Sequence, residues 1–519
     1  MQSYSQAIYA VDSTDSTEPI PRSRPETHVT PLASWVLPNF RVLIFAVAIF
    51  EVLFLSRGSS RLFHDSDTGW HIRNGERILS TSALPRNDPF SYTRPGQPWF
   101  AWEWLSDAIF GASNRLAALA GVAFVAAVGI ALTVSGSAQL ALSLGGNLFF
   151  TAFASVLLLG TTSIHWLARP HVFSWLLALL FLSVAEAERR SPGRALYLLP
   201  LAAILWTNMH GSFLLGPAIL FIYTFGEWAA GKTVRRFAAA SLACLAATFI
   251  NPYGWRLHEH IFAYLQNDYL MDHISEFRSF NFHSGGALYV ELFLGVAVMG
   301  TVALLRRRAF APALLSIALL HMSLYSARHV ATAAVLLLPL SVAALTREAK
   351  EWVRGRPFLE YCERLLVFDR RIWGLVPILM VLVLTAFGLS RLERAGRVGF
   401  DSVTFPAGAT DFLETTQLQR DPAGRIFTKD QWGGYLIYRF AGRAKVFMDG
   451  RSDFYGKDLL ETYAQITEVK PGWDTALKKY DVRFVLVPPD NALSSVLQLS
   501  PGWKRIYSDR VASVFERVS

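Results

Sequence analysis

Long apolar runs recur along most of the 519 residues of this chain, and they constrain its fold more than any other feature. Hydrophobic residues make up 52% of the chain and charged residues only 17%, which is more apolar surface than one water-soluble core can bury. A helix needs about 20 apolar residues to cross a bilayer, so we predict an all-α polytopic membrane domain with about 11 transmembrane helices. The predicted spans are residues 35–56, 116–134, 148–162, 172–187, 195–207, 213–228, 237–250, 287–305, 309–324, 330–345 and 372–389.

The loops between these runs alternate in character. Arginines cluster in every second loop, whereas the intervening loops are rich in His, Asp, Asn and Trp. The positive-inside rule places arginine-rich loops in the cytoplasm, so we expect the N-terminus inside and the other set of loops outside. Loop 57–115 is assigned outside despite its arginines, because the rule governs long loops only weakly. The arginine-rich loops are 189–194, 232–236, 306–308 and 347–371.

Composition divides the chain into three regions. Residues 1–34 are rich in Ser, Thr and Pro, which predicts a disordered cytoplasmic tail. Residues 35–391 form the predicted transmembrane domain, whose outer loop 57–115 is expected to carry two interfacial helices rich in tryptophan. Residues 392–519 have the composition of a small extracytoplasmic α/β domain. Within that domain we predict strands at 434–438, 445–448, 482–487 and 512–515 and helices at 407–415, 457–466 and 472–477.

Several function classes find no support in the sequence. The net charge of +9 is explained by the inner loops, and no basic stripe with interleaved aromatics predicts a nucleic-acid partner. The chain has no phosphate loop, no HExxH zinc motif and no GxSxG elbow. Cys244 lies in a predicted span and Cys362 in an inner loop, so no disulfide is expected.

The first outer loop carries the acidic pair Asp65 and Asp67. In an extended segment, residues two apart project to the same side, so both carboxylates can face one point. Such a pair suits a hard cation, Mg²⁺ or Mn²⁺, or a general base whose pKa the second carboxylate raises. The alternative is that these residues cap a helix beginning near Thr68.

Other polar residues of the outer loops are candidates for substrate binding. Glu103 lies among tryptophans, where it faces either a site or solvent, and we include it among the catalytic candidates. Arg169 and Arg328 are suited to grip a lipid-linked phosphate through paired hydrogen bonds, with snorkelling to the headgroups as the alternative. The candidate substrate-binding residues are His71, Asp88, Arg169, His171, Asn208, His210, Glu276, Arg328 and His329.

The chain resembles the type-C (GT-C) integral-membrane glycosyltransferases, in a poorly characterised bacterial branch. The resemblance begins at Asp65-Ser66-Asp67, directly after the first span, and touches most of the chain. It is carried by residues 65–78 (DSDTGWHIRNGERI), 84–93 (LPRNDPFSYT), 96–105 (GQPWFAWEWL), 206–216 (WTNMHGSFLLG), 251–255 (NPYGW) and the C-terminal segment 433–451.

This resemblance implies an inverting transfer from a polyprenyl-phosphate-linked sugar to a lipid, glycan or protein acceptor on the outer face of a bacterial inner membrane. It implies that Asp67 or Asp65 is the general base and that Arg169, Arg328 or His329 holds the donor phosphate. The Asp-Glu pair of mannosyl- and aminoarabinose-transferring relatives is Asp-x-Asp here, so neither donor sugar nor metal requirement carries over. In the C-terminal domain, Asp449-Gly450 is typical of a hairpin turn, with sugar or cation binding as the alternative.

Two other functions remain open at the level of sequence. A transporter or flippase of a lipid-linked saccharide predicts ionisable residues deep within spans and repeated halves, whereas Glu51 and Glu291 are the main mid-span charges. A non-catalytic membrane scaffold that presents the C-terminal domain would tolerate loss of both Asp65 and Asp67.

Overall fold

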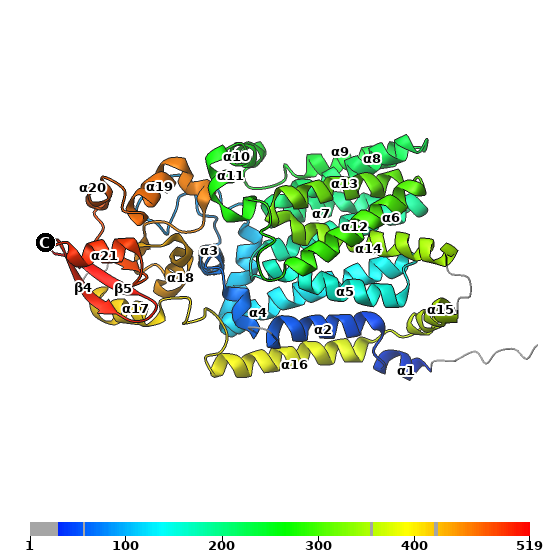
Figure 1. The fold of residues 1–519 in the computed structure, drawn as a ribbon, viewed down its shortest axis with the longest axis horizontal. Coiled ribbons are helices and arrows are strands. Elements are labelled where there is room, and N and C mark those ends of the chain that lie inside the picture. The colour runs from blue at the N-terminus through cyan, green and yellow to red at the C-terminus, as the bar shows by residue number, and fades with distance from the viewer. Residues whose placement is uncertain (1–29, 56–57, 353–356, 420–423, 519) are drawn as a thin grey trace, which may run out of the picture.

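The computed structural model of the chain describes residues 30–55, 58–352, 357–419 and 424–518. The molecule is elongated: a bundle of long helices fills one end, and a smaller domain containing a sheet forms the other (Figure 1). Most of the predicted tail lies outside the described residues, and helix α1 (Pro31–Val36) begins within the last part of it.

Eight helical segments within the described ranges are long and apolar enough to cross a membrane, so the chain is a multi-pass membrane protein. Each of the eleven predicted runs overlaps a helix, but α7 (Leu199–Thr207), α9 (Arg235–Ala247) and α13 (Phe310–Tyr325) are short. Eleven crossings are therefore not confirmed. The remaining helices of the bundle are α2 (Phe40–Phe54), α4 (Trp104–Ser143), α5 (Leu148–Thr162), α6 (His171–Arg190), α8 (Leu215–Ala229), α12 (Ala287–Arg306), α14 (Ala327–Trp352) and α16 (Leu375–Arg394).

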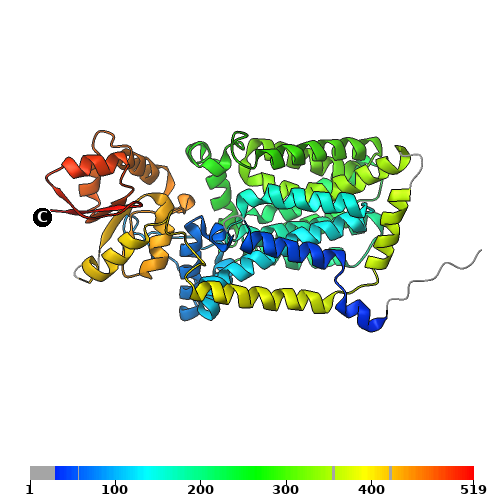
Figure 2. The ribbon, with the colours of Figure 1, turned by 60° about the horizontal axis from the view of Figure 1, so that its bottom comes forward.

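The arginine-rich loops meet at the end of the bundle that lies away from the sheet domain. Hydrogen bonds and ion pairs join the loops that follow α4, α6, α8, α12 and α14, so these loops share one side of the bundle. Helix α15 (Pro357–Asp369) lies at this end, and α16 carries the chain back to the sheet domain (Figures 1 and 2). The joining contacts are Arg190 to Ser143, Arg236 to Glu188, Arg307 to Glu348 and Arg347 to Leu144.

The C-terminal domain is built on one five-stranded sheet in the order β2-β1-β3-β5-β4. Strand β1 pairs in parallel with β2 and β3, while β5 pairs antiparallel with β3 and β4. All four residues of β3 are buried, as expected for a central strand covered on both faces. The strands are β1 (Arg425–Thr428), β2 (Lys445–Val446), β3 (Phe484–Val487), β4 (Trp503–Ser508) and β5 (Ser513–Arg517).

Helices cover both faces of this sheet, and they confirm the three predicted helices at 407–415, 457–466 and 472–477. Strands β1 and β4 and helix α21 were not predicted. The helices are α17 (Ala407–Phe412), continued by a π-helical turn (Leu413–Gln417), α18 (Asp430–Phe440), α19 (Ser452–Thr467), α20 (Trp473–Lys479) and α21 (Ala492–Leu499).

The strand predicted at 434–438 is wrong, because this segment lies within helix α18. Its buried residues Trp432, Tyr435 and Leu436 recur at helical spacing. Gly433 and Gly434 allow close packing: a β-carbon at Gly434 would overlap the backbone of Ser66, and one at Gly433 would overlap the backbone of Met448. The glycines therefore bring two backbones together and do not mark a strand.

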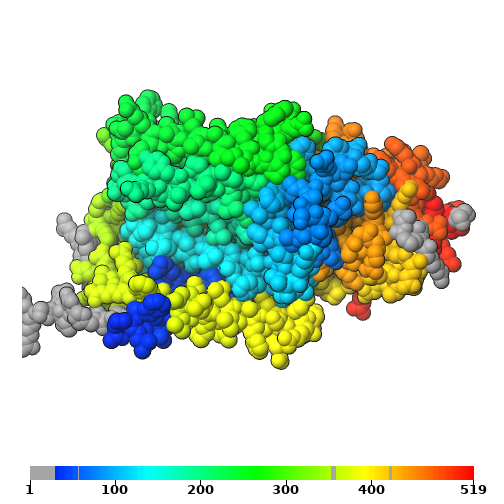
Figure 3. Space-filling view, turned by 180° about the vertical axis from the view of Figure 1, so that it is seen from behind, coloured from blue at the N-terminus to red at the C-terminus, as the bar shows by residue number. Residues whose placement is uncertain are grey.

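Helix α3 (Asp67–Thr81) lies between the bundle and the C-terminal domain and packs against both α4 and α18. The predicted helix at 99–104 begins only at Trp104, where α4 starts, and α4 is broken by non-helical residues Ala117 and Ala118. Trp99 is buried within the protein and does not extend to a lipid surface. The space-filling view shows the segment after the first membrane helix packed directly against the C-terminal domain (Figure 3).

Further short elements complete the junction. Helices α10 (Trp255–Leu265) and α11 (Asp268–His273) flank it beside the bundle (Figure 1). The 3₁₀ turns are Gly58–Phe63, Ser163–His165, Ala195–Leu198, Gly211–Leu214 and Ser275–Phe277.

Candidate functional site

A cavity of about 1070 Å³ opens at the junction between the helical bundle and the C-terminal domain. Its wall combines the first outer loop, the segments before α6, α8 and α14, the 251–286 loop and the edge of the C-terminal domain. The chain thus brings together residues that are up to 396 positions apart, from His64 to Leu460. The predicted site residues on this wall are Asp65, Asp67, Glu103, Arg169, His210, Glu276, Arg328 and His329.

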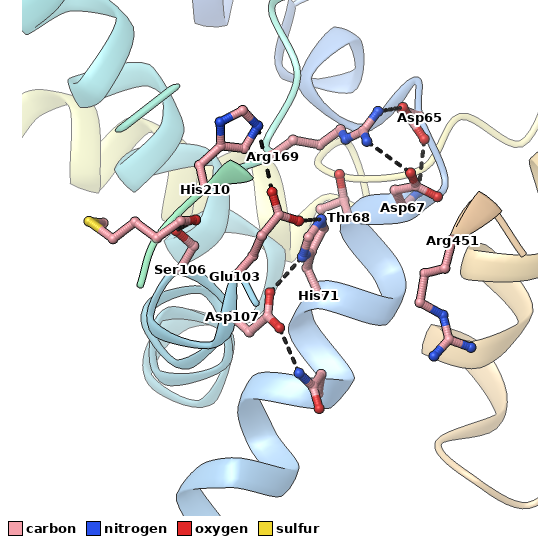
Figure 4. Close-up of polar contacts among 12 residues, drawn as sticks. Asp65, Asp67, Thr68, His71, Glu103, Ser106, Asp107, Arg169, His210 and Arg451 are labelled. Atoms are coloured by element: carbon pink, nitrogen blue, oxygen red, sulfur yellow. Dashed lines mark hydrogen bonds and ion pairs between the residues drawn. The ribbon is translucent and has the colours of Figure 1, made fainter. Parts of the chain in front are cut away.

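The guanidinium of Arg169 joins the carboxylates of the first outer loop. Its Nη1 atom lies 2.6 Å from Asp65 Oδ2, and its Nη2 atom lies 3.0 Å from Asp67 Oδ2 (Figure 4). Nη1 also lies 3.4 Å from Glu276 Oε1. Asp65 Oδ1 accepts a hydrogen bond of 2.9 Å from the backbone N–H of Asp67, the first residue of α3, whereas the N-cap residue Ser66 makes no side-chain cap bond.

Electrostatics at this cluster favour a fixed positive charge on Arg169. Although burial alone would lower it, Asp65 and Asp67 raise the pKa of Arg169 well above its usual value. Burial, with the charge of Asp65, raises the pKa of Asp67, and Arg169 opposes that rise. Burial alone would raise the pKa of Glu276. The positive charges of Arg169 and Arg328 outweigh it and lower this pKa to about 2, so Glu276 is ionised at neutral pH.

Glu103 lies between two imidazoles, those of His71 and His210 (Figure 4). Its carboxylate oxygens are 3.8 Å from His71 Nε2 and 3.5 Å from His210 Nε2 (Figure 4). Burial raises the pKa of Glu103 to about 7, with His71 opposing that rise. Burial also lowers the pKa of His71 to about 3, so His71 is neutral at physiological pH. Glu103 therefore lacks a strong cationic partner and can change protonation near neutrality.

Each of these imidazoles makes a second contact through its Nδ1 atom. His71 Nδ1 is 2.5 Å from Asp107 Oδ1, and Asn74 Nδ2 donates a bond of 2.6 Å to Asp107 Oδ2. His210 Nδ1 lies 2.8 Å from the hydroxyl of Ser174. In the part of the chain that the structure describes, His71 Nε2 has no hydrogen-bond partner, and it points toward Glu103.

Arg328 is the less constrained of the two predicted phosphate-binding arginines. Its Nε lies 3.8 Å from Glu276 Oε2, and its guanidinium lies 5.1 Å from the ring of Phe277. About a third of its side chain (34%) is exposed in the cavity, whereas Arg169 is 18% exposed. Arg328 thus retains donors for an incoming anion.

The C-terminal domain supplies the remaining wall through Asp449-Gly450-Arg451. This segment joins β2 to α19, so the predicted hairpin turn is wrong. Arg451 is buried and pairs with Asp449 at 2.7 Å and with Asp88 at 2.8 Å. Its guanidinium also lies 4.6 Å from the ring of Trp99. The pairing with two acids on different segments ties the C-terminal domain to the first outer loop.

Four predicted substrate-binding residues do not line the main cavity. His71 is fully buried beneath Glu103, and Asp88 is occupied by Arg451. Asn208 accepts a bond from Trp104 Nε1 and donates to the backbone of Ile250, which ties neighbouring helices. His171 lines a smaller adjoining space of about 80 Å³.

The fold of this chain is similar to that of solved archaeal enzymes. AglB, the oligosaccharyltransferase of Archaeoglobus fulgidus, matches in complex with an inhibitory peptide and a dolichol-phosphate, at 11% identity and a TM-score of 0.58 over 92% of this chain and 74% of AglB. Its complex with Zn and sulfate matches at 12% identity and a TM-score of 0.57, over 86% and 68% of the two chains. This chain has the GT-C fold.

The GT-C fold is also that of ArnT from Cupriavidus metallidurans, which matches at 16% identity and a TM-score of 0.48, over 92% of this chain and 96% of ArnT. No family model matches the sequence. No curated protein sequence matches it either.

The GT-C fold raises the question of a metal ion, and the residues present do not fit one between Asp65 and Asp67. The Arg169 guanidinium takes up that position, and Asp65 Oδ1 already accepts the Asp67 N–H. Across the described ranges, no group of three or more His, Cys, Asp or Glu residues is arranged to hold a metal ion. The predicted Mg²⁺ or Mn²⁺ therefore finds no ready set of ligands.

One residue that supports the site was missed in the sequence. Asp107 follows Glu103 by four positions, one helical turn, and that spacing was a usable signal. Gly450 and Arg451 lie in the segment for which sugar or cation binding was the alternative to a turn, but the sequence gave no signal for their partners Asp67 and Asp88, which lie more than 300 positions away.

Proposed function

We propose that the chain is an inverting glycosyltransferase that transfers a sugar from a polyprenyl-phosphate-linked donor to a lipid, glycan or protein acceptor. The observation that carries the proposal is the convergence of four predicted acids, Asp65, Asp67, Glu103 and Glu276, with Arg169 and Arg328 on one large cavity beside the membrane domain. Glycosyl transfer needs a base for the acceptor and positive charge for the departing phosphate. The presence of dolichol-phosphate and a peptide on the similarly folded AglB supports this choice of substrates.

The donor phosphate binds at Arg328 in this proposal. Arg328 lies at the start of α14, is partly exposed in the cavity and has only a distant acidic partner. Apolar residues of α10 and α11, including Ile261, Leu265 and Met271, line the same cavity and suit the prenyl chain. In this proposal the membrane lipid and the polyprenyl carrier approach the cavity along the helices of the bundle.

Glu103 is the proposed general base. A base must have a free carboxylate oxygen near the acceptor and a pKa near the working pH. Asp65 and Asp67 each direct a carboxylate oxygen to the Arg169 guanidinium, so that oxygen is not free for the acceptor, whereas Glu103 faces only imidazoles. We therefore assign Asp65 and Asp67 to holding Arg169, although the sequence favoured them as the base.

The transfer is a single displacement with inversion at the anomeric carbon. The acceptor oxygen forms a bond to this carbon as its proton passes to the Glu103 carboxylate. The bond from the carbon to the phosphate oxygen breaks, and the lipid phosphate leaves with the bonding electron pair beside Arg328 and Arg169. The neutral imidazole of His71 behind Glu103 adds no positive charge of its own to the carboxylate before the reaction.

The proposed orientation places the site on the outer face of a bacterial inner membrane. The arginine-rich loops gather at the opposite end of the bundle, as cytoplasmic loops do. The N-terminus is then cytoplasmic, and the C-terminal domain is extracytoplasmic.

Transfer by purified protein from a panel of radiolabelled polyprenyl-phosphate sugars tests the proposal. We expect one donor to yield labelled product, and Glu103→Gln to lower the rate by about 10²- to 10⁴-fold. Glu461→Gln, at a half-exposed residue of α19, is the matched control and should keep the wild-type rate. Movement of the lipid-linked saccharide across vesicles without transfer would instead identify a flippase.

A further inference from the structure

The position of Arg169 suggests a role beyond simple phosphate binding. Its guanidinium lies between the carboxylates of Asp65 and Asp67, the place where a cation shared by the two acids would bind. Glu276 approaches the same guanidinium from the 251–286 loop at 3.4 Å. Three acids from two separate loops thus surround one side chain.

The carboxylate oxygens of the pair have little capacity left for a metal ion. Asp65 uses Oδ1 for the Asp67 N–H and Oδ2 for Arg169, and Asp67 uses Oδ2 for Arg169. The other oxygen of Asp67 lies against the backbone of Gly450. A divalent ion would need to displace a guanidinium that carries its own positive charge.

The backbone of Arg169 is fixed to the elements that carry these acids. The N–H of the preceding residue, Ala168, donates a bond of 2.8 Å to Leu62 O, just before the acidic segment. The Thr68 hydroxyl donates a bond of 3.1 Å to Ala168 O from the first turn of α3. One of these bonds lies on each side of Asp65 and Asp67 in the sequence, and together they hold Arg169 beside the two acids.

We propose that Arg169 is a built-in cation that takes the place of a divalent metal ion in the transfer reaction. This inference rests on the proposed function. As the bond between the anomeric carbon and the phosphate oxygen breaks, the phosphate keeps the electron pair, and Arg169 offsets that charge with Arg328. The acceptor proton goes to Glu103, so the step needs no further reactant. Asp65 and Asp67 hold the guanidinium as they would hold an ion.

The first experiment uses the wild-type protein alone. After dialysis against EDTA, Mn²⁺ is added and free ion is measured by electron paramagnetic resonance. We expect no stoichiometric Mn²⁺ binding, and we expect transfer to continue unchanged in EDTA. One Mn²⁺ bound per chain and lost in Asp67→Asn, or transfer abolished by EDTA and restored by Mn²⁺, would overturn the inference.

The second experiment removes the side chain. Arg169→Ala leaves Asp65, Asp67 and Glu276 without their shared partner, so we expect it to gain Mn²⁺ binding and to lose transfer by about 100-fold or more. The added substitution Asp67→Asn should abolish the new Mn²⁺ binding. Arg278→Ala, at an exposed arginine of the 251–286 loop, is the control and should neither gain Mn²⁺ nor lose transfer. An Arg169→Ala protein that binds no Mn²⁺ contradicts the arrangement around the guanidinium.

Failure of this inference and failure of the proposed function give different results. If no donor in the panel is transferred, the proposed function fails, but Mn²⁺ binding by the wild-type protein still decides whether Arg169 fills the cation position. If transfer occurs and depends on Mn²⁺, the function stands and the role of Arg169 is wrong.

Discussion

Gly450 lies directly against the carboxylate of Asp67, so the C-terminal domain touches the acidic pair of the membrane domain. A β-carbon at Gly450 would overlap the Asp67 side chain. Asp67 is thereby held between the guanidinium of Arg169 and the backbone of a domain that begins more than 300 residues later. The C-terminal domain therefore shapes the site as well as covering it.

Gly450→Ala should displace Asp67 and, with it, Arg169. A displacement of about 1 Å in a catalytic group can lower a rate by about 100-fold, and we expect a loss of transfer of that order. Gly502→Ala is the matched control, because it lies in the same domain with open space around its α-carbon. Equal transfer rates in both variants would show that Gly450 does not set the position of Asp67.

The pH dependence of transfer should report Glu103. Because a base must be deprotonated and burial raises the pKa of Glu103 to about 7, kcat/KM should rise as pH increases through about 7 and then level off. Asp67→Asn should lower the rate but keep this limb, whereas the residual rate of Glu103→Gln should lack it. A limb that persists in Glu103→Gln would assign the base to another residue.

Arg328→Gln should weaken donor binding more than it slows the acceptor step. Loss of a charged hydrogen bond costs about 1.5–3 kcal/mol, which corresponds to a rise in the donor KM of roughly 10- to 150-fold. Arg278→Gln, in the loop that also carries Glu276, is the control. The donor KM of each variant, measured with the acceptor saturating, tests this assignment, which an unchanged value would contradict.

Arg451 should contribute to stability through its two buried ion pairs. Arg451→Met leaves Asp449 and Asp88 unpaired, and breaking a buried pair from one side costs about 3–5 kcal/mol. The rate of limited proteolysis of the C-terminal domain in detergent measures this loss of free energy of unfolding.

The exposed ion pair between Arg425 and Asp481 provides the control for that measurement. Arg425→Met should change the free energy of unfolding by less than about 1 kcal/mol. Adding Asp88→Asn and Asp449→Asn to Arg451→Met should recover part of the lost stability. A fully additive further loss would contradict the pairing.

The proposed orientation predicts which ends of the bundle a membrane-impermeant maleimide can reach. In a chain with Cys244→Ala and Cys362→Ala, Leu499→Cys on the C-terminal domain should react in intact spheroplasts, because Leu499 is 86% exposed. Arg306→Cys, at the arginine-rich end, should react only after permeabilisation. The reverse pattern would invert the assigned topology.

Sequence periodicity was sufficient to locate the helices of the bundle, because an apolar run of helical length has few other stable forms in lipid. The arginine alternation also grouped loops that the structure joins at one end. Short helices such as α7 and α9 show where length alone fails to decide how many segments cross.

The candidate site was predictable in its members but not in its contacts. The alternation of loops identified Asp67, Glu103 and Arg169 as neighbours on one side, and all three line the cavity. Their pairing depends on tertiary packing: nothing near Arg169 in the sequence distinguishes an arginine bound to Asp65 and Asp67 from one free for phosphate. The same limit explains α18, whose Gly434 packs against Ser66 and Gly69, far away in sequence.

The contact between α3 and α18 has an evolutionary consequence. A β-carbon at Gly69 would overlap the backbone of Gly434, and one at Gly434 would overlap the backbone of Ser66, so the two segments meet backbone to backbone at these glycines. Such a joint cannot absorb a substitution on one side by repacking on the other. Relatives that exchange their C-terminal domains should therefore inherit the first outer loop together with it, as a single unit of recombination.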